Sequence, residues 1–332
     1  MKTKNLSAKR LNHSSIYLKV NSILKKYKKN NSFVVAVSGG PDSLALTTLT
    51  NELAKKNKYK VFFAMVDHGL RKNSAQEATQ VKKLLKKHKI NLIILKNRLK
   101  ITNNIQKNAR EIRYKLLENF CKRKGAKSLI VAHHQDDQLE TFLIRLSRGS
   151  GVEGLSSMQE MTILKNGTRL IRPLLDFKKV DLKNIAKKKF GKIFKDPSNK
   201  NKRFLRTNIR ELKNNLVNKG LEIDKIMRSI KNIASTKQAI DFYVSESIKK
   251  LVSFESKITI INFKKFKSQP QEIKFRIINS VVKKRSNSYY PPRSKKVFNL
   301  IEGFQTNRIK KCTLGGCIFE RKKTYLHVSK EL

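Results

Sequence analysis

The sequence predicts an α/β protein in which a parallel sheet covered by helices is followed by a second, mainly helical α+β domain. Three observations support this prediction. Short apolar runs alternate with segments of helical periodicity over the first 150 residues. The runs are continuously apolar, as in Val61–Val66, which is typical of parallel strands buried on both faces. After residue 150 the alternation stops and longer helical segments follow.

The first half of the chain shows a regular alternation of strand and helix. Strands are predicted at about 33–37, 60–66, 90–95 and 128–132, and helices at about 43–56, 74–88, 104–124 and 136–147. In such sheets the carboxyl ends of the strands lie along one edge, and ligands bind there. Polar clusters follow several of these strands, so we expect residues distant in sequence to meet above that edge.

The second half begins with a Gly-rich stretch at 148–154 and a basic helix near 178–190. Residues 203–251 have helical periodicity, as do 270–283 and 293–304. Short strands are predicted near 258–262, 309–313, 316–319 and 324–328. We therefore place a domain boundary near residue 215, between a sheet domain of residues 1–215 and a helical domain of residues 216–332.

The composition favours a folded protein of the cytoplasm. With 332 residues and 39% hydrophobic content, the chain can form two or three domains with their own cores. It has no run of 18 apolar residues, and residues 1–30 lack the apolar centre of a signal peptide, so no membrane association is expected. Cys121, Cys312 and Cys317 form no paired framework, which argues against a zinc ribbon or iron–sulfur cluster and favours reduced, buried thiols.

The charge is strongly positive, with 76 Lys and Arg against 24 Asp and Glu and a net charge of +52. A field of this sign concentrates polyanions at the surface, which predicts nucleic acid as a partner. An AT-rich genome would also enrich Lys, Asn and Ile, and the two explanations are compatible. Because Lys is spread along the whole chain, charge alone does not locate a footprint. The quaternary state is left open, and a homo-oligomer is compatible with the sequence.

A glycine-rich turn joins the first predicted strand to the following helix. Its sequence is Ser38-Gly39-Gly40-Pro41-Asp42-Ser43. Gly39 and Gly40 allow the backbone to approach an anion closely, and the serines add hydroxyl groups. The next helix directs its free N–H groups and positive dipole end at the same place. The turn matches neither the Walker loop nor the dinucleotide fingerprint, but it predicts a phosphate site.

Asp42 distinguishes this turn from other phosphate loops. Phosphate would repel a carboxylate there unless a divalent cation lay between them, which predicts Mg²⁺ held between Asp42 and a polyphosphate. The alternative is an ordinary strand-to-helix turn in which Asp42 caps the helix.

A second polar cluster, His133-His134-Gln135-Asp136-Asp137-Gln138-Leu139-Glu140-Thr141, follows the fourth predicted strand. Asp136 and Glu140 are one helical turn apart and Asp137 lies three residues before Glu140, so two carboxylates can share a helix face. They could hold a metal or grip a cationic substrate, or they could form a capped and solvated acidic turn. Adjacent histidines at a strand end point to opposite faces, which disfavours zinc.

Taken together, these motifs resemble tRNA(Ile)-lysidine synthase, a family of N-type ATP pyrophosphatases that contain a PP-loop. The resemblance rests on Ser38–Ser43, Val66–Arg71, Ala109–Tyr114, His133–Thr141, Arg148–Leu155 and Ile171–Leu175, and continues in Asp196–Asn199, Arg203–Arg210 and Thr313–Cys317. It covers nearly the whole chain, and the order and spacing are specific. Gln106 stands where the family would have an acidic residue. The further C-terminal domain of long family members is expected to be absent.

The resemblance implies an adenine nucleotide α-hydrolase-like (PP-loop) domain followed by a tRNA-binding domain. It also implies the reaction. ATP adenylates the C2 carbonyl oxygen of the wobble cytidine in the CAU anticodon of tRNA(Ile), releasing pyrophosphate, and free L-lysine then attacks that carbon and displaces AMP. Mg²⁺ and backbone donors would stabilise the charge that develops on the departing pyrophosphate.

The resemblance suggests roles for individual residues. ATP would be bound by Ser38, Gly39, Gly40, Pro41, Asp42 and Ser43, with Asp42 also the expected Mg²⁺ ligand. Catalytic roles fall to Asp42, Asp137, Glu140 and Arg113. Asp137 and Glu140 would orient the lysine ammonium or share the metal, and Arg113 would pair with the lysine carboxylate or a phosphate. Arg203, Arg206 and Arg210 share a helix face that would contact tRNA, with a solvated basic face as the alternative.

Two other functions compete with the ligase. A tRNA thiolase on the same fold would need sulfur-handling cysteines near the active site, which Cys121, Cys312 and Cys317 do not supply. A non-catalytic RNA-binding protein would have no use for the phosphate turn combined with the acidic cluster.

Overall fold

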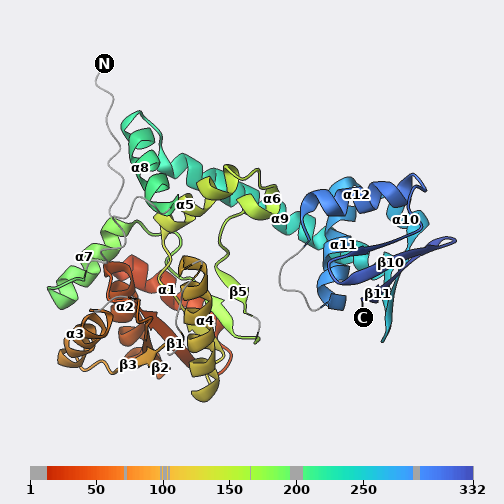
Figure 1. The fold of residues 1–332 in the computed structure, drawn as a ribbon. Helices are drawn as coiled ribbons and strands as arrows, with labels where there is room; N and C mark the ends of the chain where they lie inside the picture. Colours follow the sequence, from red (N-terminus) through yellow and green to blue (C-terminus); the bar gives the residue numbers. More distant parts are fainter. Residues whose placement is uncertain are drawn as a thin grey trace. The chain divides into compact units, whose positions relative to one another are not determined.

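The computed structural model describes residues 13–70, 73–97, 99, 103, 105–164, 166–194, 205–286 and 292–331. The chain forms two compact units, residues 1–231 and 232–332 (Figure 1). The limit between them falls within α9, Ile223–Leu251. The domain boundary near residue 215 stays a prediction.

The first unit contains a six-stranded sheet in the order β3-β2-β1-β4-β6-β5. Its strands are β1 Ser32–Val37, β2 Lys60–Asp67, β3 Leu92–Lys96, β4 Ser128–Ile130, β5 Met161–Ile163 and β6 Arg169–Ile171. All neighbours pair in parallel except β5, which is antiparallel to β6. The predicted parallel sheet is therefore confirmed. The sequence did not reveal β5 and β6, because three residues are too few to show a strand's alternation.

Helices cover both faces of this sheet (Figure 1). The cores on the two faces include residues of α1 His13–Tyr27, α2 Pro41–Asn57, α3 Ser74–Lys87 and α7 Lys179–Phe190 on one side and of α4 Ile105–Arg123 on the other. The first unit also contains α5 Gln135–Leu146, which contacts α6 Val152–Leu155 and α8 Leu205–Asn218. The predictions for α2, α3, α4, α5 and α7 are confirmed to within a few residues. Helix α1 was not predicted, although its buried residues Ile16, Val20, Ile23 and Leu24 have helical spacing.

Successive side chains of β1 point to opposite faces of the sheet, and the core therefore has two layers. Phe33, Val35 and Val37 join the cluster formed with α1, α2, α3 and α7, whereas Val34 joins the cluster formed with α4. Successive strand residues point to opposite faces, so a continuously apolar strand can serve both layers. Because both faces of the strands are buried, the positions of the strand ends are fixed. The polar clusters follow directly after these ends.

The second unit is an α+β structure, as predicted. Its five-stranded antiparallel sheet has the order β7-β8-β11-β10-β9. The strands are β7 Val252–Phe254, β8 Ile258–Asn262, β9 Lys311–Leu314, β10 Cys317–Lys322 and β11 Tyr325–Lys330, and the helices are α10 Phe263–Lys267, α11 Gln271–Ser286 and α12 Ser294–Gln305. Ile261, Phe319 and Leu326 project from the sheet into the core shared with these helices. Among the described residues, no helix has both the length and the apolar character needed to cross a membrane.

Candidate functional site

The turn between β1 and α2 can only be built with glycine at its second position. Gly39 has φ +79°, and a Cβ placed on it would lie 2.6 Å from Val81 Cγ2 of α3. A side chain there would therefore be strained and would also clash. Gly40 caps α2 with an extended backbone, and Pro41 occupies the first helical turn, where its missing N–H costs nothing. The turn is thus held close against α3.

Two serines brace the turn from inside. The Ser38 backbone N–H donates to Ser43 Oγ at 3.1 Å, and Ser43 Oγ donates to the Gly40 carbonyl at 3.0 Å. The two hydroxyl oxygens lie 3.1 Å apart. These bonds fix the loop before any ligand arrives, beside the positive end of α2.

Asp42 lies in the first turn of α2 and faces the end of β4. Its Oδ2 is 3.4 Å from His134 Nε2, while its Oδ1 is buried and has no hydrogen-bond partner. A buried carboxylate oxygen without a partner is energetically costly, and a bound cation would satisfy it. No group of three His, Cys, Asp or Glu side chains that could hold a metal occurs in the part of the chain that the structure describes. Asp42 therefore fits Mg²⁺ of the kind that takes one carboxylate and completes its shell with substrate phosphates and water.

His134 is locked at the start of α5. Its Nδ1 accepts the Asp136 backbone N–H at 3.2 Å, and its own backbone N–H donates to Asp137 Oδ2 at 3.0 Å. Together these bonds form a capping box. Burial lowers the pKa of His134, but the hydrogen bond to Asp42 and the charges of Asp137, Asp42 and Asp136 outweigh it and raise the pKa.

The segment after β6 fixes this helix start from the other side. Ile171–Leu175, one of the motifs behind the family resemblance, runs beside it: His134 forms a parallel bridge with Leu174, and the Gln135 N–H donates to the Phe177 carbonyl at 3.0 Å. Sequence analysis assigned no role to this motif. The structure shows that it holds the backbone that presents His134 and the acidic residues.

The acidic residues of α5 are paired with cations of α8. Glu140, with 3% of its side chain exposed, accepts from Arg210 Nε at 2.5 Å on Oε1 and from Arg210 Nη2 at 3.3 Å on Oε2. Lys213 Nζ lies 3.3 Å from Asp136 Oδ2. Burial lowers the pKa of Arg210, but the Glu140 carboxylate outweighs it and raises the pKa. Glu140 and Arg210, which sequence reasoning assigned to lysine and to tRNA, therefore bind each other here.

The other predicted tRNA contacts are placed differently. Arg206 is exposed on α8 and lies outside both ion pairs. Arg203 and Asp196–Asn199 lie outside the described residues.

A cluster of arginines surrounds Tyr114 and His133. The guanidinium carbons of Arg110 and Arg113 lie 5.1 and 5.3 Å from the Tyr114 ring centroid, which is cation–π distance. Burial lowers the pKa of Arg113, and the charges of Arg110 and Arg206 act in the same direction. The cluster is therefore a place where an added anion would relieve repulsion between cations.

His133 is the functional candidate that sequence reasoning missed. Its Nδ1 is buried without a hydrogen-bond partner. Burial, followed by the charges of Arg172, Arg110, Arg113 and Arg206, holds its pKa well below the usual value, so the ring is neutral at pH 7. His68, at the end of β2, also has a buried Nδ1 without a partner, and burial and Arg113 lower its pKa. The strand-end rule placed both residues at this edge but could not give their charge state.

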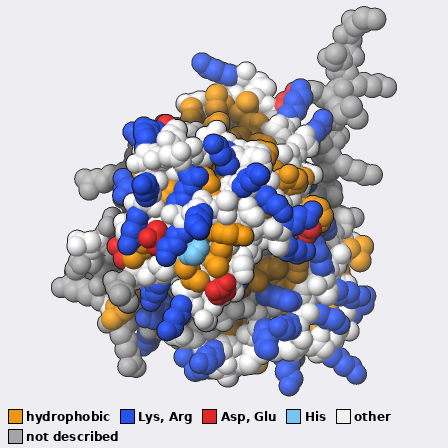
Figure 2. All heavy atoms as spheres, turned by 90° about the vertical axis from the view of Figure 1, so that its right-hand side faces the viewer, with side chains coloured by type: hydrophobic (Ala, Val, Ile, Leu, Met, Phe, Trp, Pro, Cys, Tyr) orange, Lys and Arg blue, Asp and Glu red, His pale blue; other side chains and the backbone are white. Residues whose placement is uncertain are grey.

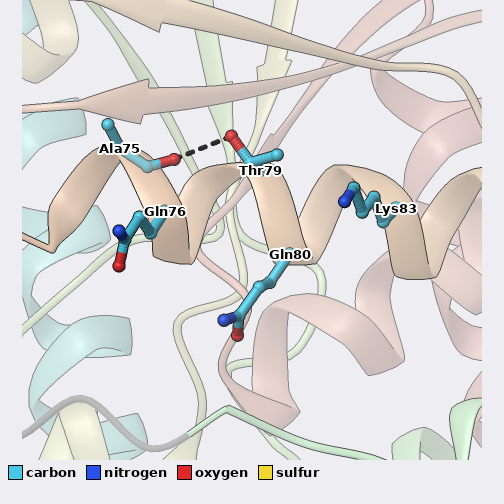
Figure 3. A pocket seen from close by; sticks show the side chains of 5 residues that line it. All are labelled: Ala75, Gln76, Thr79, Gln80 and Lys83. Atoms are coloured by element: carbon cyan, nitrogen blue, oxygen red, sulfur yellow. Dashed lines mark hydrogen bonds between the residues drawn. The ribbon is translucent and has the colours of Figure 1, made fainter.

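A shallow hollow on α3 is a poor alternative site (Figure 3). It is lined by Ala75, Gln76, Thr79, Gln80 and Lys83, and the Thr79 hydroxyl donates to the Ala75 carbonyl at 2.8 Å. These side chains include no carboxylate, imidazole or thiol. Lys83 is the one ionisable side chain among these five, so the lining offers no pair of groups for acid–base or nucleophilic chemistry.

The cysteines are unsuited to thiolate chemistry. Cys121 lies on α4 and is buried in the core between that helix and the sheet, and burial raises its pKa to about 12. Cys312 and Cys317 lie in the sheet of the second unit, and burial raises the pKa of both. Reactive thiolates have the opposite shift.

Comparison with known proteins agrees with this geometry. The family model described as a PP-loop domain matches residues 12–216. A tRNA(Ile)-lysidine synthase of Wolbachia pipientis wMel is 37% identical over 295 residues, which cover 87% of this chain and 68% of the relative. The chain belongs to the tRNA(Ile)-lysidine synthase family. A member of this family from Orientia tsutsugamushi is 33% identical over 322 residues, covering 92% of this chain and 71% of its own length. The family resemblance is thus confirmed, and with it the expectation of an ATP-using enzyme.

Among solved structures, the U34-tRNA thiolase NcsA from Methanococcus maripaludis with its [4Fe-4S] cluster has a similar fold. The TM-score is 0.55 at 20% sequence identity, over 67% of this chain and 78% of the thiolase. This likeness confirms the fold class and carries no further implication for chemistry.

Proposed function

We propose that this protein joins free L-lysine to C2 of the wobble cytidine in the CAU anticodon of tRNA(Ile), converting ATP to AMP and pyrophosphate. Family membership supports the reaction class. The observation that carries the proposal is Asp42: a carboxylate inside a braced phosphate turn, with one buried oxygen that lacks a partner. Because ATP and tRNA are cytoplasmic substrates, the cytoplasm is the proposed compartment.

The phosphate turn would bind the polyphosphate of ATP. Gly39 and Gly40 would let the backbone approach the phosphates at the positive end of α2, Pro41 starts that helix without an N–H to donate, and the hydroxyl groups of Ser38 and Ser43 hold the turn in shape. Asp42 Oδ1 would hold Mg²⁺, which when bound would neutralise charge developing on the departing pyrophosphate. The carbonyl oxygen of cytosine is a poor leaving group and AMP a good one, so adenylation makes C2 open to attack.

Lysine would bind next to the acidic end of α5. Asp137 keeps 17% of its side chain exposed beside Asp42 and His134, where a carboxylate can orient an ammonium group and take its proton. Glu140, with both oxygens engaged by Arg210, would contribute by holding that guanidinium at the site. Arg113, with Arg110 and neutral His133 beside it, would receive an anion, either the lysine carboxylate or a phosphate.

The tRNA would be attracted by the charge of +52. Figure 2 shows Lys and Arg side chains spread over one face of the molecule, with apolar side chains between them and only sparse Asp and Glu. Exposed Arg206, together with Arg203, is proposed to contact the phosphate backbone. Arg210 would support this contact from inside, through Glu140.

The deciding experiment follows labelled lysine. Incubated with ATP, Mg²⁺ and a CAU-anticodon tRNA(Ile), the protein should transfer label to the wobble cytidine and form AMP in equal amount. A matched tRNA with uridine at the wobble position, or omission of tRNA, should abolish both label transfer and AMP formation. If label stays out of the RNA while a sulfur donor is consumed, the ligase assignment fails and the thiolase replaces it.

A further inference from the structure

We propose that His134 is a positioning residue that aims the Asp42 carboxylate, so that Oδ2 is held by the imidazole and Oδ1 is left for the cation. This inference rests on the proposed role of Asp42 in binding Mg²⁺. It concerns a residue that would act through Asp42: His134 has only 4% of its side chain exposed, and its Nε2 lies 3.4 Å from Asp42 Oδ2.

The helix cap decides which nitrogen of His134 faces Asp42 with a hydrogen. Nδ1 accepts the Asp136 N–H, so in the neutral ring Nδ1 is unprotonated and the hydrogen is on Nε2. Nε2 is the atom that lies 3.4 Å from Asp42 Oδ2. The cap of α5 thus sets the tautomer that donates to the carboxylate of α2, which is how outer partners orient metal ligands.

The backbone of His134 is fixed as well. His134 bridges to Leu174, and its backbone N–H is held by Asp137 Oδ2 at 3.0 Å. Asp137 Oδ2 also lies 3.6 Å from His134 Nε2, so two carboxylates converge on one donor. Asp42 Oδ1, on the other side of the carboxyl group, has no hydrogen-bond partner. The arrangement therefore places the imidazole nitrogen beside one oxygen of Asp42 and leaves the other oxygen without a partner in the protein.

Two substitutions of similar shape separate the two roles of His134, which are capping α5 and donating a hydrogen toward Asp42. In His134→Asn the amide oxygen takes the place of Nδ1 and keeps the cap, but the donor toward Asp42 is lost. In His134→Gln the amide nitrogen reaches the place of Nε2 and keeps the donor, but the cap is lost. A purely structural role predicts that Gln is the worse variant, whereas the positioning role predicts that Asn is.

The readout is cation binding, measured by electron paramagnetic resonance of free Mn²⁺ in the presence of a non-cleavable ATP analogue. His134→Asn should weaken Mn²⁺ binding by about 10- to 100-fold, the usual effect of losing an outer partner. Binding of the analogue without metal and the midpoint of thermal unfolding should stay near wild type. His134→Gln should largely restore Mn²⁺ affinity while lowering the unfolding midpoint.

Asp42→Asn completes the set and separates this inference from the proposed function. If Asp42→Asn weakens Mn²⁺ binding and His134→Asn does not, the positioning role is overturned while the metal role of Asp42 survives. If Asp42→Asn leaves Mn²⁺ affinity unchanged, the metal role falls and the positioning role falls with it. If His134→Gln loses Mn²⁺ affinity as fully as His134→Asn, the cap and not the donor matters, and the inference is also overturned.

Discussion

Two carboxylates near the carboxyl edge of the sheet, Asp42 and Glu140, are handled in opposite ways. Asp42 on α2 has a buried oxygen without a partner, whereas both oxygens of Glu140 on α5 accept from Arg210. Leaving a buried acceptor unpaired costs roughly 1–3 kcal/mol, which a protein tolerates where a ligand completes the contact. The difference indicates that Asp42 is built for a ligand and Glu140 for holding α8 against α5.

The largest effect should come from replacing Asp42, the carboxylate with an oxygen that has no partner. Asp42→Ala should reduce pyrophosphate release by roughly a thousandfold or more, because metal-linked stabilisation of phosphate charge provides several kcal/mol. The residue lies in the first turn of α2 and belongs to none of the hydrophobic core clusters, so the unfolding midpoint should change little. Rapid-quench measurement of pyrophosphate, with circular dichroism for folding, tests both statements. Near-normal release by a folded variant would remove the contrast between the two carboxylates.

Breaking the pair between Arg210 and Glu140 should lower the stability of the protein. Arg210→Ala leaves Glu140 buried without its cation and should lower the free energy of unfolding of the first unit by about 2–4 kcal/mol, somewhat less than for a fully buried pair because 32% of the Arg210 side chain is exposed. Urea denaturation measures this. Arg206→Ala is the matched control on the same helix, and we expect its change to stay within about 0.5 kcal/mol. Equal stabilities for the two variants would show that the Arg210–Glu140 pair does not anchor α8.

Replacing Arg206 should affect tRNA binding rather than stability. Arg206→Ala is expected to reduce the slope of log K against log salt concentration by about one, the effect of losing one phosphate contact. Filter binding of tRNA(Ile) across a salt series gives the slope, and Arg206→Lys, which keeps the charge, should retain it. A wild-type slope for Arg206→Ala would make this residue a solvated surface cation.

The smallest effect is expected from the thiols. Replacing Cys121, Cys312 and Cys317 together by Ala should leave lysine transfer to tRNA largely unchanged, because the nucleophile is the amine of lysine and burial raises the pKa of all three thiols. The assay is label transfer at a temperature where the variant is folded. Loss of transfer in a folded triple variant would bring sulfur chemistry back into consideration.

Sequence reasoning succeeded where the information was local. The strand-turn-helix around Ser38–Ser43, the continuous apolar strands and the acidic start of α5 follow from periodicity, glycine positions and capping residues. These features also predicted that Asp42 and the His133–Glu140 cluster would meet at one sheet edge, and the 3.4 Å approach of His134 to Asp42 bears this out. Even the missed helix α1 had a readable pattern.

The sequence did not reveal which charged residues pair between helices that are far apart in the chain. Arg206, Arg210 and Lys213 share a helical face that reads as one basic surface, yet only packing shows that Arg210 and Lys213 face Glu140 and Asp136 while Arg206 remains exposed. The same holds for the neutral state of His133, which burial and arginines distant in sequence produce.

The sequence by itself therefore determined the fold class, the phosphate turn and the family, because these depend on residues adjacent in the chain. The tertiary structure decided which charged side chains pair with each other and which remain for ligands. That choice depends on distances of a few ångströms between helices far apart in sequence, at which electrostatic and hydrogen-bond energies change steeply.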